Sequence, residues 1–159
     1  MLTLRAVLAP DELLDQIRTR YSGLVQTTTW GERVFFYNPG GALSHGVYFL
    51  SLKERDSAND VSSRLDEQGA YRVNVSLAPL RYHAMFGAPP DRASHHGPSA
   101  AALVATDVLA PHPVYAWLGW AAIVNPTAAT LERLWPILDE SYALAQQKHA
   151  SRLREGGRR

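Results

Sequence analysis

The stretch Arg33-Val34-Phe35-Phe36-Tyr37-Asn38-Pro39-Gly40-Gly41, followed after a short loop by Gly46-Val47-Tyr48-Phe49-Leu50-Ser51-Leu52-Lys53, decides the fold class. Both hydrophobic runs are rich in the β-branched and aromatic residues that are enriched in strands. The Asn-Pro-Gly-Gly segment between them is a turn signal, because proline presets the second turn position and glycine accepts a positive φ. The stretch therefore predicts two strands joined by a turn.

The same patterns extend to the rest of the chain. Strand-like runs rich in β-branched or apolar residues occur at 25–30, 70–76 and 117–124, and proline sits where the first turn of a helix would begin at Pro10, Pro79 and Pro126. The order of the elements is helix, three strands, strand, helix, strand, helix. It predicts an α+β fold in a single domain, with a mainly antiparallel sheet of about five strands flanked by N-terminal and C-terminal helices.

Two of these helices carry specific expectations. For the last helix, we expect Asn125 to be the cap and Pro126 to be the first helical residue. The short helix that begins at Pro79 is expected to bury Leu80, His83 and Ala84 on one face, with Phe86 as a further candidate for that face.

Charge divides the chain unevenly. The protein has 159 residues, 16 basic and 15 acidic. Residues 148–159 hold five basic residues and one acidic residue, a net charge of +4, which leaves residues 1–147 with −3. We therefore expect one domain over 1–149 and a basic flexible tail over 150–159. The basic residues at this end are Lys148, Arg152, Arg154, Arg158 and Arg159. They are candidates for contacts with nucleic-acid phosphates, the alternative being a solubilising end of the chain.

Composition excludes several classes of protein. The chain has no cysteine, so disulfides, thiolate metal sites and cysteine nucleophiles are excluded. No run of about 18 apolar residues occurs, so we expect no membrane span. A cytoplasmic location is the expectation, and monomer or homodimer is left open.

Motifs for metal binding or catalysis are weak. The six histidines show no His-Glu-x-x-His or similar spacing, so neither a metal nor a cofactor is expected, although distant histidines could still meet in space. Ser44 stands beside His45 but lacks the Gly-x-Ser-x-Gly turn of a hydrolase nucleophile. Catalysis is thus the less favoured reading, and it would need a group such as His112 to meet a carboxylate.

A polar and aromatic set on or beside the expected strands is the better candidate site. Arg72 and Asn74 are two residues apart and project from one face of a strand, while Val73 and Val75 project from the other. The full set is Tyr37, Arg72, Asn74, His112, Tyr115 and Trp120. A guanidinium with aromatic rings can bind an anionic or planar ligand. The alternative is structural: Arg72 pairs with a carboxylate of the domain and the rings belong to the core.

The C-terminal third carries a family resemblance. The residues that carry it are Trp120-Ala-Ala-Ile-Val-Asn-Pro-Thr, Leu134, Ile137-Leu138, Ser141-Tyr142, Leu144 and Lys148. Earlier in the chain, the lysine-ended strand Tyr48-Phe-Leu-Ser-Leu-Lys53 adds to it. This pattern resembles the MmcQ/YjbR-like bacterial domains. The resemblance implies a small α+β fold and a proposed DNA-binding role.

The whole chain also resembles an uncharacterised bacterial group of similar length. The matching segments are Phe35–Pro39, Tyr71–Val75, Met85–Gly87, His112–Tyr115, Trp120 and Asn125-Pro126. We expect a binding domain with a small-molecule or anion pocket on the sheet face, and DNA binding through the basic end is the alternative.

Overall fold

The computed structural model describes residues 6–92 and 105–156. Its sheet has six strands in the order β1-β2-β3-β4-β6-β5, and every neighbouring pair is antiparallel. The strands are β1 (Leu24–Thr29), β2 (Glu32–Tyr37), β3 (Val47–Lys53), β4 (Arg72–Ser76), β5 (Ala110–Pro111) and β6 (Trp120–Val124). The helices are α1 (Pro10–Arg20), α2 (Leu65–Gln68), α3 (Pro79–Phe86) and α4 (Ala128–Gly156), with short 3-10 turns at η1 (Pro39–Gly41) and η3 (Ala116–Leu118). The predicted α+β class is confirmed, and the two-residue β5 is the strand beyond the five expected.

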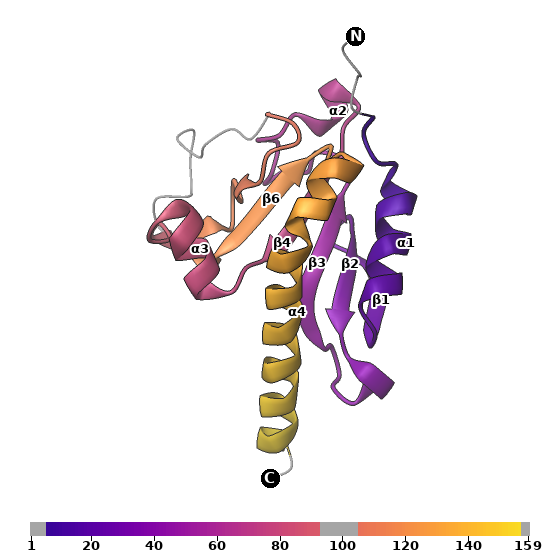
Figure 1. The fold of residues 1–159 in the computed structure, drawn as a ribbon, viewed down its shortest axis with the longest axis vertical. Coiled ribbons are helices and arrows are strands. Elements are labelled where there is room, and N and C mark those ends of the chain that lie inside the picture. The colour runs from indigo at the N-terminus through magenta and orange to yellow at the C-terminus, as the bar shows by residue number, and fades with distance from the viewer. Residues whose placement is uncertain (1–5, 93–104, 157–159) are drawn as a thin grey trace.

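Helices α1 and α4 lie side by side over one face of the sheet, and α4 continues past its lower edge (Figure 1). Leu13 and Ile17 of α1 and Leu131 of α4 belong to one buried apolar cluster with residues of the sheet. The strand residues in this cluster are Phe35, Phe49, Leu50, Leu52, Val73, Val75, Ala121 and Ile123. Strand side chains alternate between faces except at the bulge beside Phe49, so the residues between these core positions lie on the second face.

The second face of the sheet is polar at its centre. Lys53 pairs with Arg72, and Ser51 pairs with Asn74, between β3 and β4. Each of these four side chains is at most 3% exposed. They are covered by the segment between β3 and β4 and by the segment around η3, which contribute Asp60 and His112 respectively. A buried polar layer of this kind is stable only when its members are hydrogen-bonded.

The start of α4 differs from the expectation. The side chain of Thr127, not that of Asn125, accepts the N–H of Thr130 at 3.3 Å, and the carbonyl of Thr127 accepts the N–H of Leu131. The Oδ1 atom of Asn125 instead accepts the N–H of Tyr71. Threonine is a good cap, so the helix begins at Ala128, two residues beyond the predicted first helical residue Pro126. At its other end α4 runs to Gly156, so residues 150–156 continue the helix.

The short helix α3 lies where it was predicted, but of the expected buried face only Phe86 packs against the core. Tyr82 is 1% exposed and its ring packs on Phe86, whereas Leu80 is 86% exposed. His83 and Ala84 are also exposed. Eight residues make little more than two turns, too few for apolar spacing to fix which side faces the core.

Candidate functional site

Arg72 is the centre of a buried hydrogen-bond network on the polar face of the sheet. Its guanidinium is fully buried and donates to both oxygens of Asp60, at 3.1 and 2.5 Å. A further bond reaches Ser63 Oγ at 2.9 Å, and Nε donates to Asn74 Oδ1 at 2.8 Å. A guanidinium has five N–H donors, and four of them have acceptors within the protein. Arg72 therefore organises the surrounding loops.

His112 touches the same guanidinium. Its Nε2 lies 3.3 Å from Nη2 of Arg72, while its Nδ1 accepts the backbone N–H groups of Val114 and Tyr115 at 3.0 and 2.9 Å. A ring nitrogen that accepts two N–H groups carries no proton, so the proton of neutral His112 belongs on Nε2. The imidazole is thus fixed in orientation by the turn that follows it.

A second set of bonds joins Asn74 to its neighbours on β3. The Nδ2 group of Asn74 donates to Ser51 Oγ at 3.2 Å, and Ser51 Oγ lies 2.9 Å from the hydroxyl of Tyr48. Tyr48 also donates to the carbonyl of Asn74 at 3.2 Å. These bonds hold the Tyr48 hydroxyl against β3 and β4. Burial raises the pKa of its hydroxyl well above the usual value, so the group stays protonated.

Aromatic rings form a wall beside this polar layer. The rings of Tyr48 and Trp120 are stacked, with centroids 4.2 Å apart and planes 5° apart. The ring centroid of Tyr115 lies 5.3 Å from that of Trp120 and 5.1 Å from that of His112. Such rings offer flat apolar area at low cost in side-chain entropy.

These rings and polar groups line a cavity of about 580 Å³ that is partly open to solvent. Its lining is Trp30, Glu32, Tyr48, Lys53, Ser57, Asn59, Asp60, His112, Tyr115, Leu118 and Trp120. The volume is in the range of roughly 300–1,000 Å³ that is usual for small-molecule sites. One side of the cavity is aromatic and the other is polar.

Glu32 and Lys53 were missed by the sequence reasoning and lie in the cavity lining. Lys53 is 3% exposed; its Nζ donates to Ser57 Oγ at 2.8 Å and lies 3.9 Å from Glu32 Oε1. Burial raises the pKa of Glu32, and this outweighs the opposing effects of a hydrogen bond with Ser51 and of the positive charges on Lys53 and Arg72. The period of two in β3, which puts Lys53 on the face of Ser51, was the signal available in the sequence.

The chain matches one family model over residues 8–154, which spans every residue of the cavity lining. It belongs to DUF6194, a family of unknown function. No curated protein and no solved structure matches the chain.

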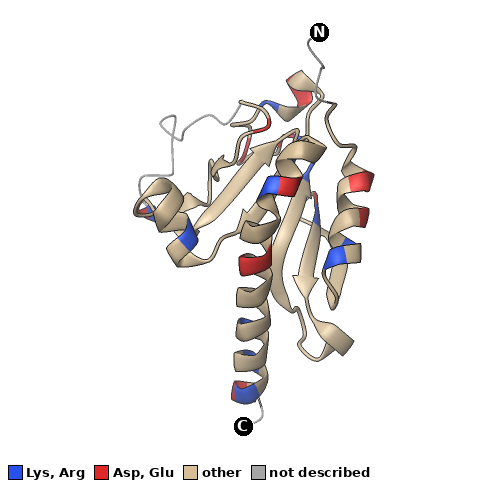
Figure 2. Ribbon diagram, viewed as in Figure 1, with Lys and Arg blue, Asp and Glu red and all other residues tan. Residues whose placement is uncertain are grey.

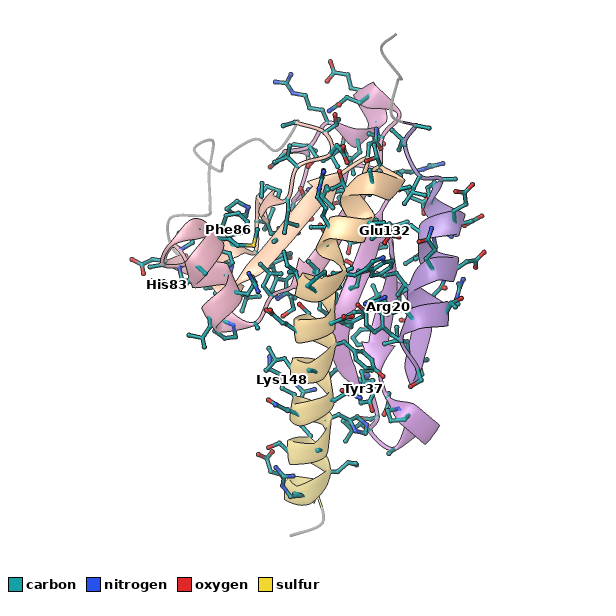
Figure 3. The ribbon with its side chains drawn as sticks, viewed as in Figure 1. Arg20, Tyr37, His83, Phe86, Glu132 and Lys148 are labelled. Atoms are coloured by element: carbon teal, nitrogen blue, oxygen red, sulfur yellow. The ribbon has the colours of Figure 1, made fainter. Side chains whose placement is uncertain are left out.

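The structure brings together five of the six predicted site residues of this DUF6194 member. His112, Tyr115 and Trp120 line the cavity, and Arg72 and Asn74 lie beneath it. Tyr37 lies elsewhere, beside α4 (Figure 3). The centroid of its ring is 5.5 Å from that of Tyr142 and 5.1 Å from that of His149. The bulge between Phe35 and Phe36 shifts the register of β2 just before this position.

Three of the five basic residues of the alternative site, Lys148, Arg152 and Arg154, belong to the last turns of α4, where Figure 2 shows basic positions at the end of the helix. Lys148, Arg152 and Arg154 are exposed, and the guanidinium of Arg152 donates to the carbonyl of Gly46 at 3.1 Å. Arg158 and Arg159 lie outside the described residues, as do two of the six histidines, His95 and His96.

The described part of this DUF6194 chain has neither a cluster of metal ligands nor a membrane-spanning helix. Within residues 6–92 and 105–156, no group of three or more His, Asp or Glu side chains is placed to hold a metal ion. No helix in the same ranges is long and apolar enough to span a bilayer.

Proposed function

We propose that this DUF6194 domain binds a small planar molecule in the cavity on the polar face of its sheet. The observation that carries the proposal is a cavity of about 580 Å³ between the aromatic wall and a polar floor, which is formed by Glu32, Lys53 and Asp60. Trp30 and Leu118 of its lining are exposed, so the cavity is open to a ligand from solvent. Here the space is bordered by Lys53, Asp60 and Glu32, whose charges are expensive to bury without a purpose.

The roles of the residues follow from their contacts. Trp30, Tyr115 and Trp120 supply stacking surfaces at the cavity. Arg72 acts as a positioning residue, because it holds Asp60 and Ser63 and touches His112. Asn74 extends that support to Ser51 and Tyr48. The polar network thus fixes the shape of the cavity before a ligand arrives, which lowers the entropy cost of binding.

The experiment is saturation-transfer NMR with a library of planar aromatic fragments. Trp30 is 69% exposed, so Trp30→Ala removes a wall of the cavity at little cost to the core. Leu80→Ala is the matched control, because Leu80 is 86% exposed and lies outside the lining. Fragments should bind the wild type and Leu80→Ala with equal affinity. Their affinity for Trp30→Ala should be about tenfold lower, because one stacking partner is lost. Equal signals with all three proteins, or none with any, would overturn the proposal.

Nucleic-acid binding through the end of α4 is the second candidate. It is supported by the exposed Lys148 and Arg154. The resemblance to MmcQ/YjbR-like domains, which itself stays a prediction, also favours it. Lys148→Gln combined with Arg154→Gln should weaken binding to a DNA duplex and flatten its salt dependence. Binding that keeps its salt dependence in this variant would remove the second candidate.

A further inference from the structure

The floor of the cavity holds a donor and an acceptor side by side. Residue 32 of β2 follows the register that pairs Arg33 with Leu52, which places Glu32 beside Lys53 on the polar face. The Nζ atom of Lys53 and Oε1 of Glu32 are 3.9 Å apart, beyond hydrogen-bond distance. Both side chains line the cavity. An edge of a ligand that meets this pair meets an ammonium and a carboxylate together.

The ammonium of Lys53 has bonding capacity left. It carries three N–H donors, and among the described residues Ser57 Oγ supplies its hydrogen bond. The side chain is 97% buried, since its exposed fraction is 3%. A buried donor without an acceptor costs free energy, so a ligand acceptor at this point would be favourable.

The charges around the floor balance. Arg72 is neutralised by Asp60 through two hydrogen bonds. The remaining cation is Lys53 and its nearest anion is Glu32. An anionic ligand group would gain from Lys53 but be repelled by Glu32, and a cationic group would meet the reverse. An uncharged group that accepts on one side and donates on the other satisfies both residues.

Resting on the binding function proposed above, we propose that the ligand is an uncharged planar heterocycle whose edge carries a ring N–H next to a carbonyl. The carbonyl accepts from Lys53 and the ring N–H donates to Glu32. The flat ring then lies against the aromatic wall, where Tyr48 is already stacked on Trp120 and Tyr115 stands 5.3 Å from it. Lactams of the size of a nucleobase or a fused bicyclic ring have this chemistry and fit a cavity of about 580 Å³.

The test uses three bicyclic probes of similar size in isothermal titration calorimetry. Isoquinolin-1(2H)-one has the lactam edge, its N-methyl derivative lacks the donor, and 1-naphthoate is a planar anion. The lactam should bind at least about tenfold more tightly than either of the others, because each leaves one buried partner unpaired. Lys53→Met and Glu32→Ala should each weaken lactam binding by about tenfold or more and reduce its preference over the N-methyl derivative. Glu67→Gln, a change at an exposed position of α2, should leave the affinity for the lactam unaltered.

The outcomes separate this inference from the function on which it rests. Equal affinity for the lactam and its N-methyl derivative would overturn the inference while leaving a planar-ligand cavity in place. Tighter binding of naphthoate would also overturn it and would make Lys53 an anion anchor. If neither these probes nor any fragment of the library binds in the cavity, the proposed function fails together with the inference.

Discussion

Lys53 and Arg72 are cross-strand partners on one face of the sheet, and both cations are buried. Like charges placed directly opposite each other destabilise a sheet. The domain accepts this arrangement because Asp60 neutralises Arg72 and Glu32 lies 3.9 Å from Lys53. The two pairs differ in geometry: the first is closed by two hydrogen bonds, and the second is open toward the cavity.

Removing one partner of the closed pair should be costly. Arg72→Met leaves the Asp60 carboxylate buried without its cation, and we expect a loss of about 3–5 kcal/mol in the free energy of unfolding. Asp60→Asn should also destabilise the fold, yet the double variant should lose less than the sum of the two. Urea unfolding of the four proteins measures this coupling, and additive losses would show that the pair is not a unit.

The carboxylate of Glu32 should make stability fall as pH rises. Because burial raises its pKa, the folded protein keeps this proton to a higher pH than the unfolded chain does. The folded state therefore binds more protons between the ordinary glutamate pKa, about 4.3, and the raised value, and stability declines across that window. Glu32→Gln removes this pH dependence, so the free energy of unfolding of the variant should rise relative to that of the wild type as pH increases.

Chemical denaturation at a series of pH values checks this prediction. Glu67→Gln makes the same chemical change at an exposed position and serves as the control. A stability difference between Glu32→Gln and the wild type that stays flat, or turns against the variant as pH rises, would contradict it.

Gly46 should be the least replaceable glycine of the turn between β2 and β3. Its φ is +78°, and a Cβ atom would lie 2.7 Å from Asn38 Cβ and 2.9 Å from the carbonyl oxygen of Tyr37. Gly40 has a similar φ of +66° with no atom within 4 Å of its Cβ position. Gly40→Ala should cost about 1–2 kcal/mol from backbone strain alone, and Gly46→Ala clearly more. Equal thermal shifts for the two variants would show that the close contact is relieved without cost.

The fold was predictable because its signals are local. The β-branched and aromatic runs of β2 and β3, and the prolines that begin α1 and α3, act within a few residues of themselves. The cap of α4 was misassigned because Asn125, Pro126 and Thr127 all suit a helix start. Contacts with Tyr71 and Asp107 engage Asn125 and Thr127, respectively, and sequence spacing cannot show such contacts.

The site was predictable in part, for a similar reason. Alternation on β4 put Arg72 and Asn74 on one face, and the structure has both there. Which of the 15 acidic residues pairs with Arg72 depends on how the segment between β3 and β4 folds back, and no pattern in the sequence encodes that path. Glu32 and Lys53 were missed for a different reason: alternation puts Lys53 on the face of Ser51, but its proximity to Glu32 arises from the register between β2 and β3.

The most direct test of the binding cavity uses the four tryptophans as reporters. Trp30 and Trp120 line the cavity, whereas Trp117 and Trp135 do not. In protein labelled with ¹⁵N at the indole nitrogens, planar heterocyclic fragments should shift the Trp30 and Trp120 signals and leave those of Trp117 and Trp135 in place. Fragments that shift none of the four signals, or that shift Trp117 or Trp135 instead, would contradict the assignment of this cavity as the binding site.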